Sequence, residues 1–252
     1  MQITIITLFP EMFQALNYGI IGRAQQQSLL KINLLNLRDF SQNKHQRVDD
    51  KPYGGGPGMV LQAQPLQAAI EKALMNTPAD TPVSYTSPQG EDFNQNAAQA
   101  LSKRSHLILI AGRYEGIDER ICQTHIQEMW SIGDFVLTGG ELPVMCMIDA
   151  VTRLLPGVLG NPQSALDDSF TVHQGLLDFP HYTRPQTIAG VSVPSVLVSG
   201  HHQAIQTWRL QQALGNTWRK RPDLLEKRGL NAKEKQLLVA FIANDTKENP
   251  PQ

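Results

Sequence analysis

Short apolar runs and stretches of helical spacing follow one another along the first part of the chain. Gln2 to Leu8 and Ile32 to Leu37 are short runs rich in aliphatic residues, which favour strands. Between them, Glu11 to Gln27 carries apolar residues at helical spacing, although two glycines weaken the helix prediction. A strand, a helix and a strand in this order are typical of the opening of an α/β domain.

The same alternation predicts four further elements before residue 112. We expect a helix over Pro65 to Met75 and a short strand over Val83 to Thr86. Asn94 can cap a helix that runs to Leu101. His106 to Ala111 is apolar without interruption, which is typical of a strand buried on both faces of a parallel sheet.

A β-rich run from Trp130 to Leu137 ends at the pair Gly139-Gly140, and Pro143 then suits the first turn of a helix. The residues at helical spacing in that helix are Val144, Met147, Ile148, Val151, Leu154 and Leu155. A turn without side chains lets a flat ligand approach main-chain N–H and C=O groups closely. We therefore predict that this turn forms part of a cofactor pocket.

Glycine-bearing turns follow three predicted strands in succession. They contain Gly90 in Ser87-Pro88-Gln89-Gly90, then Gly112 with Gly116, and then Gly139-Gly140. In parallel α/β sheets, ligands bind outside the carboxyl ends of the strands. Three such turns at one edge of the sheet predict a pocket more strongly than any one of them.

The long polar segment from Arg38 to Met59 contains Asp49, Gly54-Gly55-Gly56 and Gly58. Its glycines match neither the dinucleotide fingerprint nor the Walker loop. Two interpretations stand: backbone that lies flat against a ligand, or a plain flexible loop.

Beyond residue 155 the pattern changes. Pro156 to Gly175 is a candidate linker that contains Asp168, and Leu176 to Ser199 is irregular. His202 to Leu214 is a predicted helix, and Asn231 with Glu234 forms a capping box for the last helix.

The composition is that of a globular protein, and the charge is distributed unevenly along the chain. The 252 residues are 41% hydrophobic and 18% charged, and no apolar run approaches the roughly 20 residues of a membrane span. Cys122 and Cys146 form no zinc pattern, so we expect a reduced, cytoplasmic setting. From Gly200 onward nine Lys and Arg face five Asp and Glu, which gives +4 and leaves −5 before it. This basic end is compatible with a polyanion partner or with an ordinary solvated helix face.

Several charged residues allow two interpretations. Glu115 and Asp118 can fix polar groups of a ligand, but their spacing favours a salt-bridge cluster with Arg113 and Arg120. Arg153 follows an apolar helix and can bind an anion or a carbonyl, or form a structural ion pair.

Asp168 in the linker can accept a proton over a bound substrate, although its pattern alone favours capping or plain solvation. Trp208, Trp218 and the basic run 219–221 can grip nucleic acid, but the tryptophans are more typical of a helical core. His201-His202 has no partner ligand at a useful spacing, and we predict no metal site.

Eight blocks of sequence, in one order, carry a family resemblance. They are Leu8 to Phe13, Asp49 to Met59, Ser87 to Gly90, Gly112 to Arg120, Trp130 to Asp134, Gly139 to Pro143, Asp168 to Phe170 and Pro180 to Pro185. In them the chain resembles the bacterial tRNA (guanine-37-N1)-methyltransferases of the SPOUT class, from residue 1 to about residue 243.

The resemblance implies an α/β fold with a SPOUT-type parallel sheet, a deep trefoil knot and a small C-terminal all-α domain. Residues 1–160 would form the knotted catalytic domain that binds S-adenosylmethionine, 161–176 a linker and 177–252 a helical tRNA-binding domain. It also implies a homodimer in which each active site is shared between protomers, and no membrane association.

The implied reaction is methyl transfer from S-adenosylmethionine to N1 of guanosine 37 in tRNA. Asp168 matches the family's general base, and Arg153 matches the residue that stabilises negative charge on O6. Residues matching those that place guanine or tRNA are Glu115, Asp178, His181, Asp49 and Gly58. Residues matching those that hold the cofactor are Tyr85, Thr86, Ser87, Pro88, Gly90, Gly112, Arg113, Tyr114, Glu115, Gly116, Ser131, Ile132, Gly133, Asp134, Leu137, Gly139, Gly140 and Pro143. Mg²⁺ is linked to activity in the family, but the sequence offers no dedicated ligand set for it.

Two departures and two alternatives accompany this resemblance. Phe135 stands where the family often has Tyr, and Thr171 to Gly175 varies in length, so positions inside it carry no role over. The alternatives are a SPOUT methyltransferase acting on another RNA position and an RNA-binding protein without catalysis.

Overall fold

The structure is a computed structural model, and it describes residues 1–75, 77–161, 168–171 and 175–248. The chain divides into two compact units, Met1–Gly160 and Asn161–Gln252. Each unit has its own hydrophobic core.

The first unit is built on a five-stranded sheet in the order β2-β1-β6-β5-β7, in which every pair is parallel. The strands are β1 (Gln2–Thr7), β2 (Lys31–Asn36), β5 (Val83–Asp92), β6 (His106–Ile110) and β7 (Glu128–Ser131). The apolar runs predicted as the first, second and fourth of these strands are confirmed. Because β6 lies in the interior of the sheet, its uninterrupted apolar run is buried on both faces.

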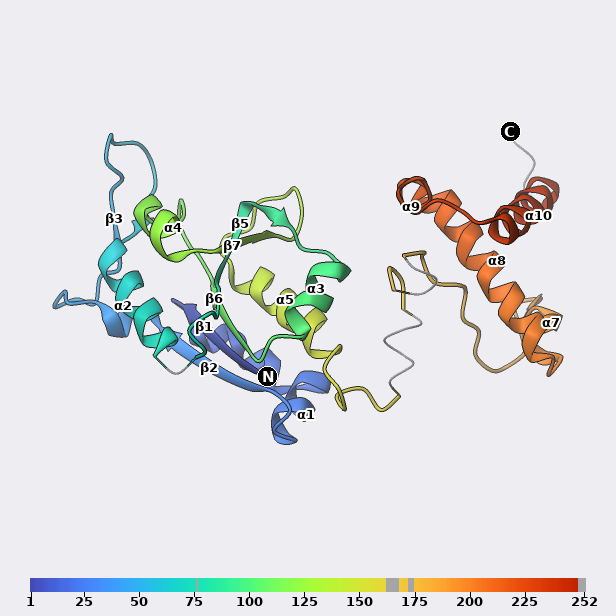
Figure 1. The fold of residues 1–252 in the computed structure, drawn as a ribbon, viewed down its shortest axis with the longest axis horizontal. Coiled ribbons are helices and arrows are strands. Elements are labelled where there is room, and N and C mark those ends of the chain that lie inside the picture. The colour runs from blue at the N-terminus through green and yellow to red at the C-terminus, as the bar shows by residue number, and fades with distance from the viewer. Residues whose placement is uncertain (76, 162–167, 172–174, 249–252) are drawn as a thin grey trace. The chain divides into compact units, whose positions relative to one another are not determined.

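Helices cover both faces of this sheet (Figure 1). They are α1 (Gly19–Gln26), α2 (Ala63–Leu74), α3 (Gln95–Ser102), α4 (Glu119–His125) and α5 (Glu141–Thr152). Alternate residues of β6 divide between two cores: Leu107 packs with α1, α3 and α5, whereas Ile108 packs with α2 and α4. The first unit is therefore a three-layer α/β sandwich.

The helix predicted over Glu11 to Gln27 is instead two elements. A 3-10 helix, η1 (Pro10–Asn17), precedes α1, and Tyr18 between them is extended. Gly19 has φ +62°, a left-handed conformation that ends one helix geometry before the next begins. The two glycines that weakened the prediction mark this break.

The β-rich run from Trp130 to Leu137 was assigned wrongly. Strand β7 ends at Ser131, and Gly133 turns the chain with φ +141°. Phe135 and Val136 are 54% and 89% exposed, so their apolar character does not come from a buried strand. This run is a loop that precedes α5, in which Pro143 does lie in the first turn as predicted.

The turn predicted at Ser87 to Gly90 lies within strand β5. Pairing with β7 shifts there, because Thr86 and Glu91 both lie opposite Trp130. The four residues between them therefore form a bulge, which breaks the ladder without ending the strand.

The polar segment from Arg38 to Met59 has short elements of secondary structure toward both of its ends. It starts within a short 3-10 helix, η2 (Leu37–Phe40), and strand β3 (Asp49–Asp50) pairs antiparallel with β4 (Val60–Leu61). Helix α4 was not predicted, because it is short and buries only Ile121.

The second unit is mainly helical among its described residues. Its helices are α7 (Ser195–Val198), α8 (His202–Lys220), α9 (Pro222–Arg228) and α10 (Ala232–Glu248), with a short antiparallel pair of β8 (Thr187–Ile188) and β9 (Val191–Ser192). Its core contains Leu176, Leu214 and Leu238. The capping box is confirmed, since Glu234 N donates to Asn231 Oδ1 at 2.9 Å and Asn231 N to Glu234 Oε2 at 3.0 Å.

Helix α8 continues six residues beyond its predicted end at Leu214, so that Trp208 and Trp218 both lie on it. Trp218 is 38% exposed and Trp208 is half-buried. Among the described helices, none combines the length and apolar character needed to cross a membrane.

Candidate active site

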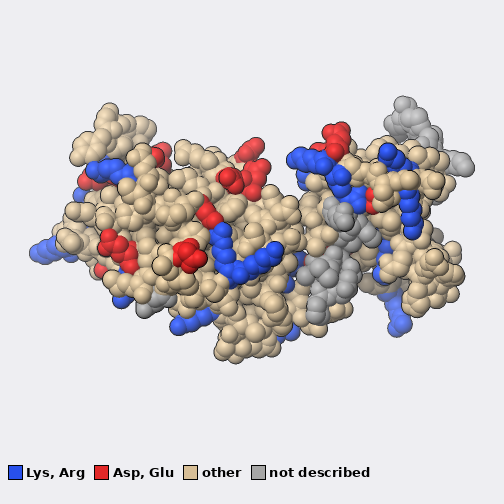
Figure 2. All heavy atoms as spheres, viewed as in Figure 1, with Lys and Arg blue, Asp and Glu red and all other residues tan. Residues whose placement is uncertain are grey.

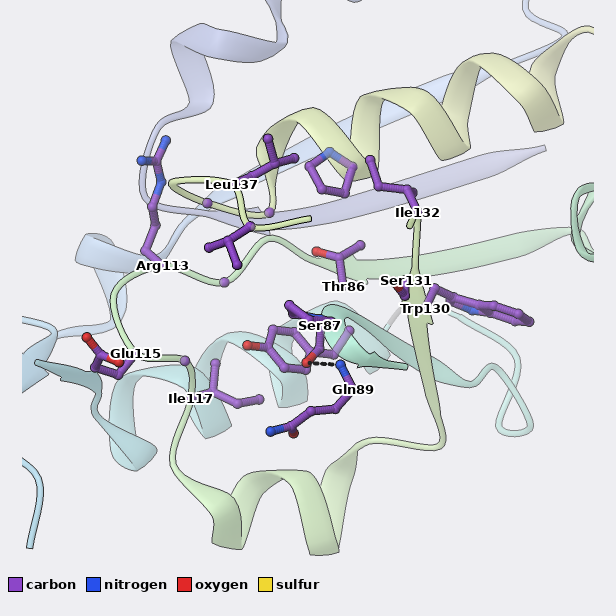
Figure 3. A pocket seen from close by; sticks show the side chains of 18 of the residues that line it. Thr86, Ser87, Gln89, Arg113, Glu115, Ile117, Trp130, Ser131, Ile132 and Leu137 are labelled. Atoms are coloured by element: carbon purple, nitrogen blue, oxygen red, sulfur yellow. Dashed lines mark hydrogen bonds between the residues drawn. The ribbon is translucent and has the colours of Figure 1, made fainter. Parts of the chain in front are cut away.

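A cavity of about 440 Å³ lies at the carboxyl ends of β5, β6 and β7, which are neighbours in the sheet (Figure 3). Its lining comes from the β5 bulge, the loop after β6, the loop after β7 and the start of α5. The convergence of three turns that the sequence predicted is therefore confirmed.

The predicted cofactor residues line this cavity with two exceptions. Gly90 is turned toward β7, where a Cβ would overlap the main chain of Met129 and Trp130. Its lack of a side chain serves strand pairing. Asp134 is exposed and does not line the cavity.

Sequence reasoning missed several lining residues, namely Gln89, Ile117, Glu119, Cys122, Trp130, Phe135, Val136 and Thr138. Most of them adjoin a residue that was predicted, so extending each turn by a few positions would have found them. Glu119 and Cys122 belong to α4, the helix that the pattern did not indicate.

The turns after β6 and β7 meet backbone to backbone. Gly140 N donates to Gly112 O at 2.8 Å, and Arg113 and Gly139 form an antiparallel bridge. A Cβ on Gly112 would lie 2.6 Å from the Tyr85 ring, and one on Gly140 would lie 2.8 Å from Gly112 N. This wall of the cavity therefore consists of main chain that only glycine permits.

The Arg113 side chain points out of the cavity in Figure 3, and it bonds residues on the outer side of the cavity wall. Its Nε lies 2.9 Å from Oε2 of Glu141, which is 1% exposed, and Nη1 donates to Thr138 O at 3.1 Å. Thr7 Oγ1 donates to the other Glu141 oxygen at 3.2 Å, and the guanidinium lies over the Phe9 ring. Glu141 opens α5, where the helix dipole favours a carboxylate.

These contacts correct the predicted salt-bridge cluster. Asp118 does pair with Arg120, at 2.6 Å, and this guanidinium lowers the pKa of the Asp118 carboxyl. Arg113 pairs with Glu141 instead, because the bridge to Gly139 turns it toward α5. Glu115 is left at the rim of the cavity.

Two groups in the cavity wall remain neutral at physiological pH. Burial, with a smaller contribution from Cys122, raises the pKa of Tyr85 to about 12. Burial and the nearby Glu119 carboxylate raise the pKa of the Cys122 thiol. The charged groups that remain along the cavity are the carboxylates of Glu115 and Glu119 and the outward-facing Arg113. The cavity therefore suits a polar ligand with a positive group.

The ordered end of the polar segment lies against the cavity rim. Leu61 N donates to Gly116 O and Glu115 N donates to Met59 O, each at 3.0 Å. Gly58 adjoins Glu115 so closely that a Cβ would overlap the carboxylate side chain. Asp49 lies opposite Leu61 in the β3–β4 pair. Three predicted substrate residues are thus brought to one region, although only Glu115 lines the cavity.

The remaining predicted residues lie elsewhere. Arg153 follows α5 as its C-cap, half-buried, with its backbone N–H bonded to Asp149 O at 3.3 Å. It does not line the cavity.

Asp168, Asp178 and His181 belong to the second unit. Asp178 N donates to the hydroxyl of Ser169, next to Asp168, at 2.9 Å, and Asp178 Oδ2 lies 2.8 Å from His181 Nε2. Within the described residues, no three His, Cys, Asp or Glu side chains are grouped as a metal site would require.

Comparisons with known proteins identify the family. A family model described as tRNA (Guanine-1)-methyltransferase TrmD matches residues 1–227. A protein of Pseudomonas putida named tRNA (guanine-N(1)-)-methyltransferase is 54% identical over 243 residues, covering 96% of each chain. Proteins of the same name from Chromohalobacter salexigens and Tolumonas auensis are each 53% identical, over 96% of this chain and 93% and 97% of their own lengths.

These matches exclude the interpretation as a non-catalytic RNA-binding protein, since they extend over nearly the whole chain and all carry one activity. The protein is therefore a methyltransferase that belongs to the tRNA (guanine-1)-methyltransferase TrmD family, of the SPOUT class.

Proposed function

We propose that this enzyme transfers a methyl group from S-adenosylmethionine to N1 of guanosine 37 in tRNA. The observation that carries the proposal is the glycine-walled cavity at the ends of β5, β6 and β7, in a chain of this family. The names of the relatives specify a tRNA and guanine N1, which supports the substrate.

The cavity fits S-adenosylmethionine in shape and in charge. The bare backbone at Gly112 and Gly140 lets a flat adenine approach, and the neutral Tyr85 adds an aromatic wall. Glu115 and Glu119 suit the positive sulfonium and amino groups. When bound, the cofactor supplies a methyl group that is already strongly electrophilic, so the protein has to position the acceptor in line and free its lone pair.

We assign the removal of the N1 proton to Asp168. A neutral N1–H is a poor nucleophile, and a carboxylate that accepts its proton raises the electron density on N1 as the new C–N bond forms and the C–S bond breaks. Asp168 is half-buried, its neighbour Ser169 accepts a hydrogen bond from Asp178 N, and Asp178 pairs with His181. Arg153 stabilises the negative charge that spreads to O6 of the guanine.

The arrangement of the domains is part of the proposal. The first unit carries the trefoil knot and the cofactor, and the helices of the second unit bind the tRNA in the cytoplasm. Two chains form a homodimer in which Asp168 of one protomer serves the cavity of the other. Most of the linker predicted at 161–176 lies outside the described residues, and we derive no step through Mg²⁺ because the described residues contain no grouped ligand set.

The direct test uses unmodified tRNA transcripts that carry G or A at position 37 and cofactor with a labelled methyl group. We expect the label on N1 of G37 by mass spectrometry of nuclease fragments, and none in the transcript with A37. Label at another position, or none in either transcript, would overturn the proposed substrate site.

A further inference from the structure

The second unit contains a cavity of its own, of about 420 Å³, and His181 is among the residues that line it. Cavities that hold small ligands span roughly 300–1,000 Å³, so this one is large enough for a nucleotide. Its walls come from the stretch after Phe179, from Val193 and from one side of α7 and α8. Among the described residues, the lining includes Phe179, Tyr182, Arg184 and Arg209 but neither Asp nor Glu.

Arg184 and Arg209, the two arginines of this cavity, differ from the other arginines of their unit in pairing with no described carboxylate. Arg219 pairs with Asp245, Arg221 with Asp223 and Arg228 with Glu234. Among the described residues, the Nε–H of Arg209 is buried without a hydrogen-bond acceptor; the same holds for the Nε–H of Arg228, but both Nη atoms of Arg228 bond Glu234.

A buried donor without an acceptor costs free energy, on the order of 1–3 kcal/mol, unless a ligand supplies the acceptor. A guanidinium presents its donors in a planar fork that matches phosphate oxygens. The positive charge of Arg184 and Arg209 thus lies at a cavity whose described lining contains no carboxylate. On the face drawn in Figure 2, Lys and Arg also predominate over Asp and Glu in this unit.

Aromatic rings stand beside these charges and are held in place. The guanidinium of Arg209 lies 4.8 Å from the centre of the Phe179 ring, and the Tyr182 ring lies 6.4 Å from that of Trp208. The chain before Phe179 is fastened to α8, because Leu177 N donates to Thr217 Oγ1 at 2.9 Å and Asn216 Nδ2 donates to Asp178 O at 3.0 Å. Arginine beside fixed aromatic rings is a common site for an unstacked nucleotide.

We propose that this cavity binds one nucleotide of the tRNA other than the one that is methylated, with its phosphate on Arg184 and Arg209 and its base against Tyr182. The methylated guanine is unsuited to this place, because the described part of the lining has no carboxylate to accept its N1 proton. The inference rests on the proposed function, since it takes tRNA as the substrate.

The test combines two variants with a matched control. Arg184→Ala removes an exposed guanidinium, and Arg209→Gln keeps much of the packing on Phe179. Arg23→Gln, the control, removes the same charge from an exposed arginine of α1 in the first unit, to which no binding role is assigned. We expect each of the first two variants to weaken tRNA binding about tenfold or more, as loss of a stacked or charge-paired nucleotide contact does, with the control within about twofold.

A second measurement locates the nucleotide. 2-Aminopurine replaces each anticodon-loop base in turn, with G37 retained, and fluorescence is recorded with the full-length protein. We expect a change at a position other than 37 that both variants lose and the control keeps. Normal tRNA affinity in Arg184→Ala and Arg209→Gln, or a fluorescence change that survives them, would overturn the inference.

Two further readouts distinguish a tRNA nucleotide from a free anion, and this cavity from the methylation site. If calorimetry shows that inorganic phosphate binds wild type and not the variants while tRNA affinity is unchanged, the cavity is a free-anion site and the inference fails. Methylation at position 37 is assayed in the same samples. Its absence in wild type, with arginine-dependent tRNA binding intact, would count against the proposed function and leave the cavity assignment standing.

Discussion

At the scale of single residues, Asp168 decides whether the proposed proton transfer occurs. General-base catalysis contributes about 10²–10⁴-fold, so Asp168→Asn should lower the single-turnover rate by this factor. Calorimetry should show unchanged cofactor affinity, because Asp168 lies outside the described first-unit cavity. Asp80→Asn, at an exposed turn, is the control. A near-normal rate in Asp168→Asn would exclude it as the base.

Arg153 is expected to affect the rate of the chemical step and not the affinity for tRNA. If its guanidinium stabilises charge on O6 only as the proton leaves, Arg153→Ala should slow the chemical step about 10²-fold while tRNA affinity changes little. Filter binding and single-turnover rates on the same preparation separate the two effects. An equal loss in both would assign Arg153 to tRNA binding.

Glu128 gives a prediction of stability against pH. Burial alone would raise its pKa, but two hydrogen bonds from Arg104, at 2.6 and 2.9 Å, and one from Ser84, at 2.8 Å, bring it below its usual value. A carboxyl with a lowered pKa in the folded state stabilises the fold above its unfolded-state pKa of about 4.3, and this stability is lost as the pH falls through the lower folded value.

Glu128→Gln should therefore lower the free energy of unfolding by about 1–3 kcal/mol at pH 7, and the difference should shrink below about pH 4. Urea denaturation at both pH values measures this. Asp223→Asn removes an exposed pair with Arg221 and should change little at either pH. A difference for Glu128→Gln that stays constant with pH would show that its cause is packing.

At the scale of elements, the sequence predicts what is buried and misassigns what is apolar but exposed. The run His106 to Ala111 identifies β6 because both faces of that strand pack into cores. The run from Trp130 to Leu137 looks the same in composition, yet Phe135 and Val136 are exposed at the cavity. Exposed apolar residues that line a binding site give the same hydrophobic pattern as a buried strand, so the pattern alone does not distinguish the two.

The cavity depends on the contact between two turns, one with Gly112 and the other with Gly139 and Gly140. Gly140→Ala would place its Cβ against Thr86 Oγ1 and Gly112 N. Forcing this close contact apart costs about 1–3 kcal/mol, so we expect cofactor affinity to fall about tenfold or more. Calorimetry measures the affinity, and thermal unfolding shows that the variant is folded.

Gly160→Ala is the matched control, because a Cβ there meets no atom within 4 Å and the residue has no positive φ. It should leave cofactor affinity unchanged. If Gly140→Ala also binds normally, the backbone contact at this turn does not shape the cofactor site.

At the scale of the whole molecule, the sequence predicts where the cavity lies, but it does not predict the distant side chains that support it or act at it. The glycine turns could be predicted to converge because parallel strands end at one edge of a sheet. The Arg113–Glu141 pair could not, because its partners are 28 positions apart and a bridge between two turns brings them together. Asp168 and Arg153 have roles only through the family resemblance, since neither lines the described cavity.

The homodimer is tested by mixing two impaired variants, with the cofactor kept below the dissociation constant of Gly140→Ala. In the proposed dimer, an Asp168→Asn chain keeps an intact cavity and a Gly140→Ala chain keeps an intact Asp168. A mixed dimer then contains one complete site, formed by the cavity of the first and the aspartate of the second, and one site that lacks both. With random exchange, half of the dimers are mixed, so equal amounts should regain about a quarter of wild-type active sites.

Active-site titration in a single turnover measures this fraction, after the chains have exchanged and size-exclusion chromatography has verified dimers. Gly140→Ala mixed with a chain that carries both substitutions is the control. It should regain nothing beyond the residual activity of Gly140→Ala alone, because every intact Asp168 then faces a damaged cavity. If each protomer instead supplied its own aspartate, no mixture would contain a complete site, and the first mixture would show only the average of its two components.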